Sequence, residues 1–155
     1  MKYPLTIAVD FDGTICEYAF PECGPPRAEV IEALRMLHEQ GWKIIVHSSR
    51  VNSQWPEPGR TEKCEVMVQY LLAHAVCFDE IWGMAFERIS TTEGTQGCMW
   101  GFEPHQVGKP VAHVYLDDRA IRPQPVFCPG TYAPETLVRL AHATAKVAND
   151  DQKEA

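Results

Sequence analysis

Four short segments of the sequence carry side chains that could act together on a phosphate group. They are Asp10-Phe11-Asp12-Gly13-Thr14, Ser48-Ser49-Arg50, Lys109 and Asp117-Asp118-Arg119. Up to four carboxylates gathered at one place would repel one another unless a divalent cation lay among them, and carboxylate oxygens suit Mg²⁺. A bound Mg²⁺ in turn indicates a phosphorylated substrate. One carboxylate could then attack phosphorus, while a second protonates the leaving oxygen and later activates water.

The spacing within the first segment suits these two tasks. Asp10 and Asp12 are two residues apart, so both can point to the same side at the end of an extended segment. Gly13 lets the backbone turn sharply and approach a phosphate closely. We therefore predict that Gly13 and Thr14 bind substrate beside the two carboxylates.

Hydroxyl and cationic groups would stabilise the charge that grows on the transferring phosphoryl oxygens. The Ser48 hydroxyl and nearby backbone amides can donate hydrogen bonds to these oxygens, and the Lys109 ammonium can neutralise them. Ser49 stands beside Ser48 and could take the phosphate instead. Arg50 and Arg119 could each bind a second anionic group of the substrate or brace neighbouring carboxylates. We group Ser49, Arg50 and Arg119 with the predicted substrate-binding residues.

The periodicity of apolar residues indicates which elements position these segments. Strands are predicted over 5–10, 42–48, 78–82 and 111–116, and helices over 28–40, about 61–74 and 135–147. Strands that alternate with helices indicate a parallel sheet in an α/β layered fold. Ligands of such sheets bind at the carboxyl ends of the strands, so we expect the four segments to meet there.

Length and periodicity together predict the domain organisation. At 155 residues the chain suffices for about one domain, which we place at 1–148. The stretch at about 83–108 shows no clean period and is too long for an ordinary loop, so we predict an irregular insertion, either a functional flap or a disordered segment. Residues 149–155 are predicted to form a flexible acidic tail.

Composition excludes some classes of partner. Lys and Arg total 14 against 21 Asp and Glu, for a formal charge of -7, so no extended groove for nucleic acid is expected. The six cysteines form no C-x-x-C pair and indicate free thiols in a reducing compartment. No apolar run is long enough for a signal peptide or a membrane span. We therefore expect a cytoplasmic protein without a membrane partner.

The four segments, in this order, resemble the motifs of the haloacid dehalogenase superfamily, in its small capless phosphatase-like branch. The match covers roughly residues 5–122 and departs from the pattern between Trp82 and Lys109. The resemblance implies a Rossmann-like three-layer sandwich with a mainly parallel central sheet, and Mg²⁺ dependence. It also implies Asp10 as the nucleophile and Asp12 as the general acid and base, with the Asp12 carbonyl on the metal.

The resemblance further implies that one acid of the pair Asp117 and Asp118 binds the metal, and we favour Asp117 because it comes first off the strand. Dehalogenases lack an acid at the position of Asp12, so the expected activity is hydrolysis of a phosphomonoester. The expected substrate is a nucleotide, a sugar phosphate or a nucleic-acid end. Two alternatives are a signalling module that keeps a phosphoryl group on aspartate and a catalytically idle binding protein on the same fold.

Two tryptophans fall in the irregular segments near the expected mouth of the site. Trp55 and Trp100 could each stack on a nucleobase. Alternatively, each ring only pins its own loop.

Overall fold

Short apolar runs form the central sheet of the chain. The computed structural model describes residues 3–90, 96–117 and 133–154. The strands of this sheet are β1 (Thr6–Asp10), β2 (Lys43–His47), β3 (Glu80–Ile81) and β6 (Val114–Leu116). All pair in parallel, in the order β3-β2-β1-β6. The middle three residues of β1 and of β2 are buried, which explains why these strands are continuous apolar runs rather than alternating ones.

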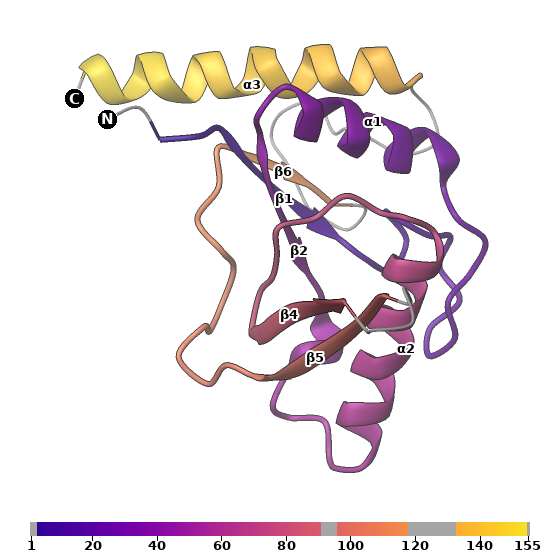
Figure 1. Ribbon diagram of the computed structural model, residues 1–155. Coiled ribbons are helices and arrows are strands. Elements are labelled where there is room, and N and C mark those ends of the chain that lie inside the picture. The colour runs from indigo at the N-terminus through magenta and orange to yellow at the C-terminus, as the bar shows by residue number, and fades with distance from the viewer. Residues whose placement is uncertain (1–2, 91–95, 118–132, 155) are drawn as a thin grey trace.

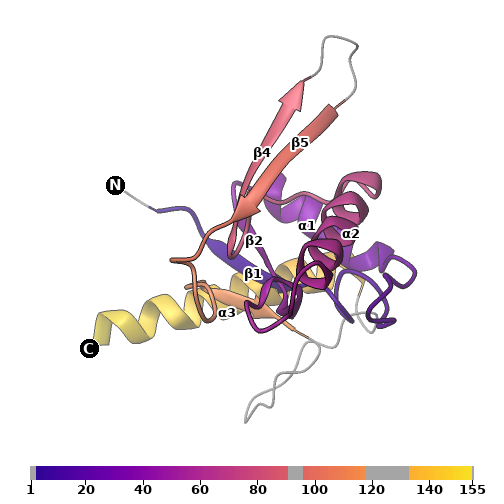
Figure 2. The same ribbon diagram turned by 90° about the horizontal axis from the view of Figure 1, so that it is seen from below.

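Helices cover both faces of this sheet. They are α1 (Ala28–Glu39), α2 (Gly59–Ala73) and α3 (Pro134–Glu154). Helices α1 and α3 lie side by side over one face, and α2 lies on the opposite side (Figures 1 and 2). The predicted fold class, a Rossmann-like three-layer α/β sandwich with a parallel central sheet, is confirmed. None of the described helices combines the length and apolarity that crossing a membrane requires.

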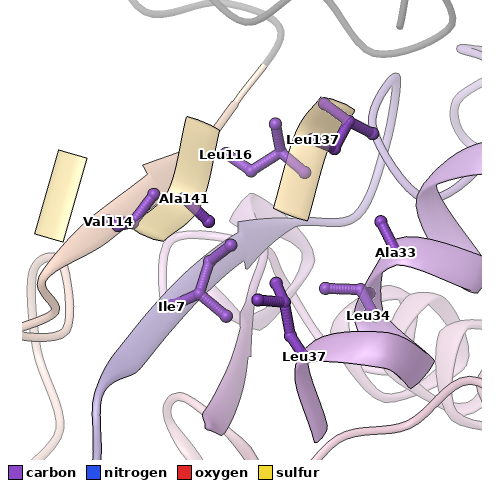
Figure 3. A pocket seen from close by; sticks show the side chains of 8 residues that line it. All are labelled: Ile7, Ala33, Leu34, Leu37, Val114, Leu116, Leu137 and Ala141. Carbon is purple, nitrogen blue, oxygen red and sulfur yellow. The ribbon is translucent and has the colours of Figure 1, made fainter. Parts of the chain in front are cut away.

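The layer between α1, α3 and the sheet is closely packed and apolar. Figure 3 shows side chains from all three converging on a small space lined by Ile7, Ala33, Leu34, Leu37, Val114, Leu116, Leu137 and Ala141. This space holds about 10 Å³, hardly enough for one water molecule. This space is therefore part of the core. The side chains packed around it hold the strands whose ends carry the predicted site.

The stretch 83–108 contains a β-hairpin, which corrects the prediction of an irregular insertion. Strands β4 (Met84–Ser90) and β5 (Gln96–Phe102) pair antiparallel, and the hairpin projects away from the parallel sheet (Figure 2). Alternate residues of β5, Cys98 and Trp100, pack against the core, whereas Met99 between them is exposed. Because the exposed Met99 is also apolar, the two-residue period is blurred, which hides the strand in the sequence. Residues 91–95 of the predicted insertion lie outside the described residues.

Side chains dock the hairpin on the rest of the fold. The indole Nε1 of Trp100 donates a hydrogen bond of 2.6 Å to Oε2 of Glu65 on α2. The ring centroid of Phe86 lies 5.2 Å from that of Phe78, a residue just before β3. Trp100 therefore pins the hairpin, which supports the second of the two interpretations for this residue.

The C-terminal segment also differs from its prediction. Residues 149–155 are predicted as a flexible acidic tail, but the backbone of α3 continues to Glu154. The tail contains Gln152, Lys153 and Glu154, residues with good intrinsic helix propensity, so a helix that is already nucleated extends through them.

Candidate active site

The ends of three parallel strands bring the predicted carboxylates to one edge of the sheet. Asp10 pairs with His47 of β2, and Val9 pairs with Leu116 of β6. Asp117 directly follows Leu116. A cleft of about 480 Å³ opens here, a volume typical of small-ligand sites. Its lining residues are Asp10, Asp12, Tyr18, Phe20, His47, Ser49, Trp55, Lys109 and Asp117.

The turn after β1 holds the first two aspartates at the cleft. The carbonyl oxygen of Phe11 accepts a hydrogen bond of 3.3 Å from the amide of Thr14, which closes the turn. Gly13 has a φ of 82°, a conformation that residues with a side chain rarely adopt. Phe11 itself is fully buried. The turn is thus anchored in the core, and Asp10 and Asp12 on either side of Phe11 both reach the cleft.

Asp12 forms a bidentate ion pair with Arg50. Nε of Arg50 donates to Oδ2 at 2.8 Å, and Nη2 donates to Oδ1 at 2.7 Å. The guanidinium also donates to the carbonyl oxygens of Pro21 at 2.9 Å and Glu22 at 3.1 Å. The Arg50 side chain is fully buried. Its charge is therefore compensated by one carboxylate and by carbonyl groups that the surrounding chain supplies.

This pair decides between the two interpretations of Arg50. A fully buried guanidinium that binds Asp12 cannot also bind a substrate anion, so the predicted substrate-binding role of Arg50 is wrong and the bracing role holds. Burial disfavours the charged guanidinium, but its hydrogen bonds to Asp12 and the negative charge of Asp12 raise the pKa of Arg50 above its ordinary value. Arg50 therefore stays charged.

The two neighbouring serines have different surroundings. Oγ of Ser48 accepts a hydrogen bond of 3.1 Å from the amide of Arg50, which caps the short 3-10 helix η1 (Ser49–Val51). Ser49, and not Ser48, lines the cleft that contains Asp10 and Asp117. Ser48 lines a neighbouring cleft. The arrangement thus favours Ser49, which lines the same cleft as the carboxylates and is the alternative that the sequence leaves open.

Lys109 reaches the cleft from the segment before β6. Its Nζ lies 3.5 Å from Oδ2 of Asp117, and its side chain is 62% exposed, whereas that of Asp117 is 11% exposed. The ammonium also lies 5.9 Å from the ring centroid of Tyr115. As predicted from the order of the motifs, Lys109 and Asp117 therefore share one cleft with Asp10 and Asp12.

Among the described residues, Thr14 is a predicted substrate-binding residue that does not line the cleft. Thr14 is fully buried, and its hydroxyl has no hydrogen-bond partner among the described residues, so its predicted contact with substrate is wrong. The reason is that the turn after β1 directs Thr14 into the protein, whereas the sequence shows only that Thr14 follows Gly13. Asp118 and Arg119 lie outside the described residues.

Sequence reasoning missed His47, which lines the cleft between the aspartates and the serines. Nε2 of His47 is buried without a hydrogen-bond partner among the described residues. Burial lowers the pKa of this imidazole below its ordinary value, and the nearby ammonium of Lys109 lowers it further. The negative charge of Asp117 acts in the opposite direction but does not cancel the effect of burial. The signal in the sequence is its position, since His47 is the last residue of β2 and pairs with Asp10.

Aromatic side chains form a further wall that sequence reasoning identified only in part. Tyr18 and Phe20 line the cleft together with Trp55. The indole Nε1 of Trp55 donates to the carbonyl oxygen of Ser49 at 2.8 Å, and its ring lies 5.7 Å from that of Phe20, between centroids. Nζ of Lys63 lies 4.7 Å from the Trp55 ring. Trp55 therefore pins the loop around η1 while its edge contributes to the cleft.

The residues present are compatible with Mg²⁺. Among the described residues, no three His, Cys, Asp or Glu side chains are grouped closely enough to hold a metal by themselves. The Asp12 carboxylate is bound to Arg50, which leaves its main-chain carbonyl as the predicted ligand. Mg²⁺ is ordinarily held by one or two carboxylates together with water and substrate phosphate. Asp10 and Asp117, which line the same cleft, fit that ligand set.

Comparison with known proteins supports the fold alone. No protein-family model and no curated protein matches the chain. A conserved protein from Bacteroides thetaiotaomicron has a similar structure, with a TM-score of 0.56 and 21% sequence identity over 91% of this chain and 92% of that one. A structural-genomics target from Vibrio cholerae matches with a TM-score of 0.46 and 20% identity over 92% of this chain and 97% of that one.

Proposed function

We propose that this chain is a Mg²⁺-dependent phosphomonoester hydrolase that acts through an aspartyl-phosphate on Asp10. The observation that carries the proposal is a single cleft lined by Asp10, Asp12, Ser49, Lys109 and Asp117, at the carboxyl edge of the parallel sheet. The resemblance of these segments to the haloacid dehalogenase motifs supports it. The substrate classes remain those predicted from the sequence: a nucleotide, a sugar phosphate or a nucleic-acid end.

Asp10 acts as the nucleophile in this proposal. One of its carboxylate oxygens forms a bond to phosphorus as the bond from phosphorus to the ester oxygen breaks, and the leaving alcohol takes up a proton. Water then attacks the phosphorus of the aspartyl-phosphate and gives up a proton. This second step releases inorganic phosphate and restores the Asp10 carboxylate.

The remaining residues of the cleft stabilise charge. Lys109 neutralises the phosphoryl oxygens, and the Ser49 hydroxyl donates a hydrogen bond to them. The carboxylates of Asp10 and Asp117 and the carbonyl of Asp12 would hold Mg²⁺, which would supply further positive charge next to the phosphate. Each group acts on the negative charge that the transition state spreads over these oxygens.

Asp12 is the proposed general acid and base. It supplies a proton to the leaving alcohol and accepts one from the attacking water. Each oxygen of its carboxylate accepts one hydrogen bond from Arg50 and keeps a second lone pair that can take up a proton. Arg50 therefore orients the Asp12 carboxylate and leaves it able to take up and release a proton.

The first experiment is an assay of phosphate release, with and without Mg²⁺. The substrates are nucleoside monophosphates, sugar phosphates, 3'- and 5'-phosphorylated oligonucleotides and phenyl phosphate. Asp10→Asn is expected to lower kcat by about 10³-fold or more, because the amide is a poor nucleophile. Asp150→Asn, a change at an exposed position on α3, is the matched control and should retain full activity. Turnover that persists in Asp10→Asn would contradict the proposal.

A second candidate function is favoured by the Asp12–Arg50 pair. If the positive charge of Arg50 makes the Asp12 carboxylate too weak a base to activate water, the phosphoryl group stays on Asp10, as in a signalling module. Intact-mass spectrometry after incubation with acetyl phosphate and Mg²⁺ separates the two functions. A lasting phosphoryl adduct that Asp10→Asn abolishes, without phosphate release, supports the signalling module. Neither adduct nor turnover would indicate a catalytically idle binding protein.

A further inference from the structure

A second cleft adjoins the candidate active site and is not used by the proposed chemistry. It encloses about 520 Å³, and it shares His47 and Ser49 with the first cleft. Its other walls come from the loop around η1 and from the segment 102–108 that follows the hairpin. Because the two clefts share residues at the phosphate site, a substrate phosphorylated at one end could occupy both at once.

The wall formed by 102–108 is held in place by hydrogen bonds. Nε2 of Gln106 donates to Oε1 of Glu80 at 2.7 Å, and Oε1 of Gln106 accepts from the amide of Gly83 at 2.8 Å. The amide of Glu103 donates to the carbonyl oxygen of Gly83 at 2.8 Å. On the other side, Nε1 of Trp82 donates to the carbonyl oxygen of Gly108 at 3.0 Å. The cleft is therefore formed before a ligand arrives, which limits the entropy lost on binding.

The charges that line this cleft do not favour a second anionic group. Among the described lining residues Arg60 is the one permanent cation, and it is already engaged. Its Nε and Nη2 donate to the carbonyl oxygen of Val51 at 3.1 and 2.7 Å, and its guanidinium lies 3.6 Å from the ring centroid of Phe102. The carboxylate of Glu103 lies in the same lining and would repel an anion.

Neutral hydroxyl groups match the same lining well. The hydroxyls of Ser48 and Ser53 can each donate or accept, and the side-chain amide of Asn52 can donate. Both oxygens of the Glu103 carboxylate can accept hydrogen bonds, and Oε1 already accepts one from the amide of His105 at 3.1 Å. Charge-assisted hydrogen bonds from ligand hydroxyls to such a carboxylate are strong.

The aromatic surface in this cleft is limited. Phe102 is covered by Arg60 and meets the ring of Trp100 at an interplanar angle of 79° and a centroid distance of 5.4 Å. Trp82 supplies the other ring of the lining. One ring can pack against the C–H groups of a sugar, whereas a nucleobase would gain most from stacking on an open aromatic face.

We propose that the second cleft binds the neutral polyol part of the substrate, a sugar or sugar alcohol whose phosphate lies in the first cleft. This inference rests on the proposed function for the site of catalysis, and it selects the sugar phosphates from the predicted substrate classes. Glu103 and Asn52 are the specificity-determining residues for the hydroxyl groups. The phosphate is recognised separately by Lys109 and Ser49.

Ligand-observed NMR tests the inference without requiring turnover. The probes are glucitol 6-phosphate, uridine 5'-monophosphate and phenyl phosphate, each with Mg²⁺. Wild-type protein is expected to bind glucitol 6-phosphate about tenfold or more tightly than phenyl phosphate, because hydroxyl contacts to a charged group are added. Equal or tighter binding of uridine 5'-monophosphate would overturn the inference, and so would equal affinity for phenyl phosphate.

Two variants with the same chemical change give the matched comparison. Glu103→Gln keeps an acceptor for the His105 amide and is expected to weaken glucitol 6-phosphate binding about tenfold, leaving phenyl phosphate binding unchanged. Glu87→Gln, on the exposed side of β4, should change neither. The inference would be contradicted if Glu103→Gln weakened the binding of both glucitol 6-phosphate and phenyl phosphate, or of neither.

Kinetics then separate this inference from the proposed function. If phenyl phosphate is hydrolysed but the polyol is not preferred, the inference fails and the proposed function stands. If no ester is hydrolysed while glucitol 6-phosphate still binds through Glu103, the proposed function fails and the polyol site stands. If the proposed function and the polyol site both hold, Glu103→Gln should raise KM for glucitol 6-phosphate and leave kcat for phenyl phosphate unchanged.

Discussion

The two ion pairs of the candidate active site differ in almost every physical respect. The Asp12–Arg50 pair is bidentate at 2.7 and 2.8 Å, and the side chains are 10% and 0% exposed. The Asp117–Lys109 pair has a single contact of 3.5 Å, and the lysine is 62% exposed. One edge of the cleft is therefore fixed in the core, and the other carries a cation that can move toward a ligand.

This difference has a clear energetic meaning. A buried pair cannot lose one member without leaving the other charge unpaired in the protein, so its removal is costly. The Asp117–Lys109 pair contributes less to folding because water already solvates the exposed ammonium of Lys109. We conclude that Arg50 serves the architecture of the site and that Lys109 is available for its chemistry.

The largest expected effect is on stability, at Arg50. Replacing Arg50 with Met leaves the Asp12 carboxylate buried and unpaired, and should lower the free energy of unfolding by about 3–5 kcal/mol. Urea denaturation followed by circular dichroism measures the change. Lys109→Met is the matched control, expected to lie within about 0.5 kcal/mol of wild type.

The double variant Asp12→Leu, Arg50→Met checks the reason for that loss. Since both charges are removed, it should recover part of the stability that Arg50→Met loses. If Arg50→Met lowers the free energy of unfolding no more than Lys109→Met does, the two pairs do not differ in their contribution to stability.

The second prediction concerns activity, on which replacing Lys109 should have a large effect although it hardly changes stability. Lys109→Met should lower kcat/KM for phenyl phosphate by about 10²-fold, or about 2.7 kcal/mol, because charge on the phosphoryl oxygens is no longer neutralised. Steady-state assays of phosphate release measure this loss. Lys43→Met, which removes an exposed ion pair with Glu80, is the control and should retain activity. Full activity in Lys109→Met would remove Lys109 from the proposed mechanism.

The third prediction divides the two adjacent serines in the same way. Ser48→Ala removes the cap of η1 and should cost about 1 kcal/mol of stability with little loss of kcat. Ser49→Ala should leave stability unchanged and lower kcat about tenfold, because one donor to the phosphate is lost. Parallel denaturation and kinetic measurements on both variants check this, and an exchange of the two effects would restore Ser48 as the phosphate-binding residue.

The fourth prediction concerns how stability depends on pH next to the buried pair. The thiol of Cys64 donates to the carbonyl oxygen of Arg50 at 3.3 Å, and burial raises its pKa to about 11 from 9.0. The unfolded chain therefore loses this proton first, so stability is complete below pH 9 and falls as pH rises toward 11.

The slope of stability against pH between 9 and 11 tests this, measured by urea denaturation. Cys64→Ala should flatten the slope in that range and leave it unchanged near pH 7. An unaltered slope in Cys64→Ala would show that Cys64 does not contribute to it.

The sequence predicted the layout of the site better than the surroundings of each residue. Continuous apolar runs ending in polar residues placed Asp10 and Asp117 at one edge of a parallel sheet, because strand direction alone determines this. Burial depends on contacts between distant segments. The sequence therefore left Arg50 open between two roles, and it assigned to Thr14 a contact that its burial excludes.

The hairpin shows a second limit of sequence reasoning. Its strands depend on cross-strand pairing and on packing against α2 and Phe78, and neither is visible in the local pattern of residues. The second cleft could not be predicted for the same reason, since its wall follows that hairpin.

The pairing of β1 with β6 has a consequence for how the chain folds. Residues of the Asp12–Arg50 pair are 38 positions apart, whereas the hydrogen bond from the amide of Thr6 to Nδ1 of His113 joins residues 107 positions apart. Contacts that close long loops are slow to form. We expect the half of the site that contains Arg50 to form first, and Lys109 and Asp117 to join it only when β6 completes the sheet.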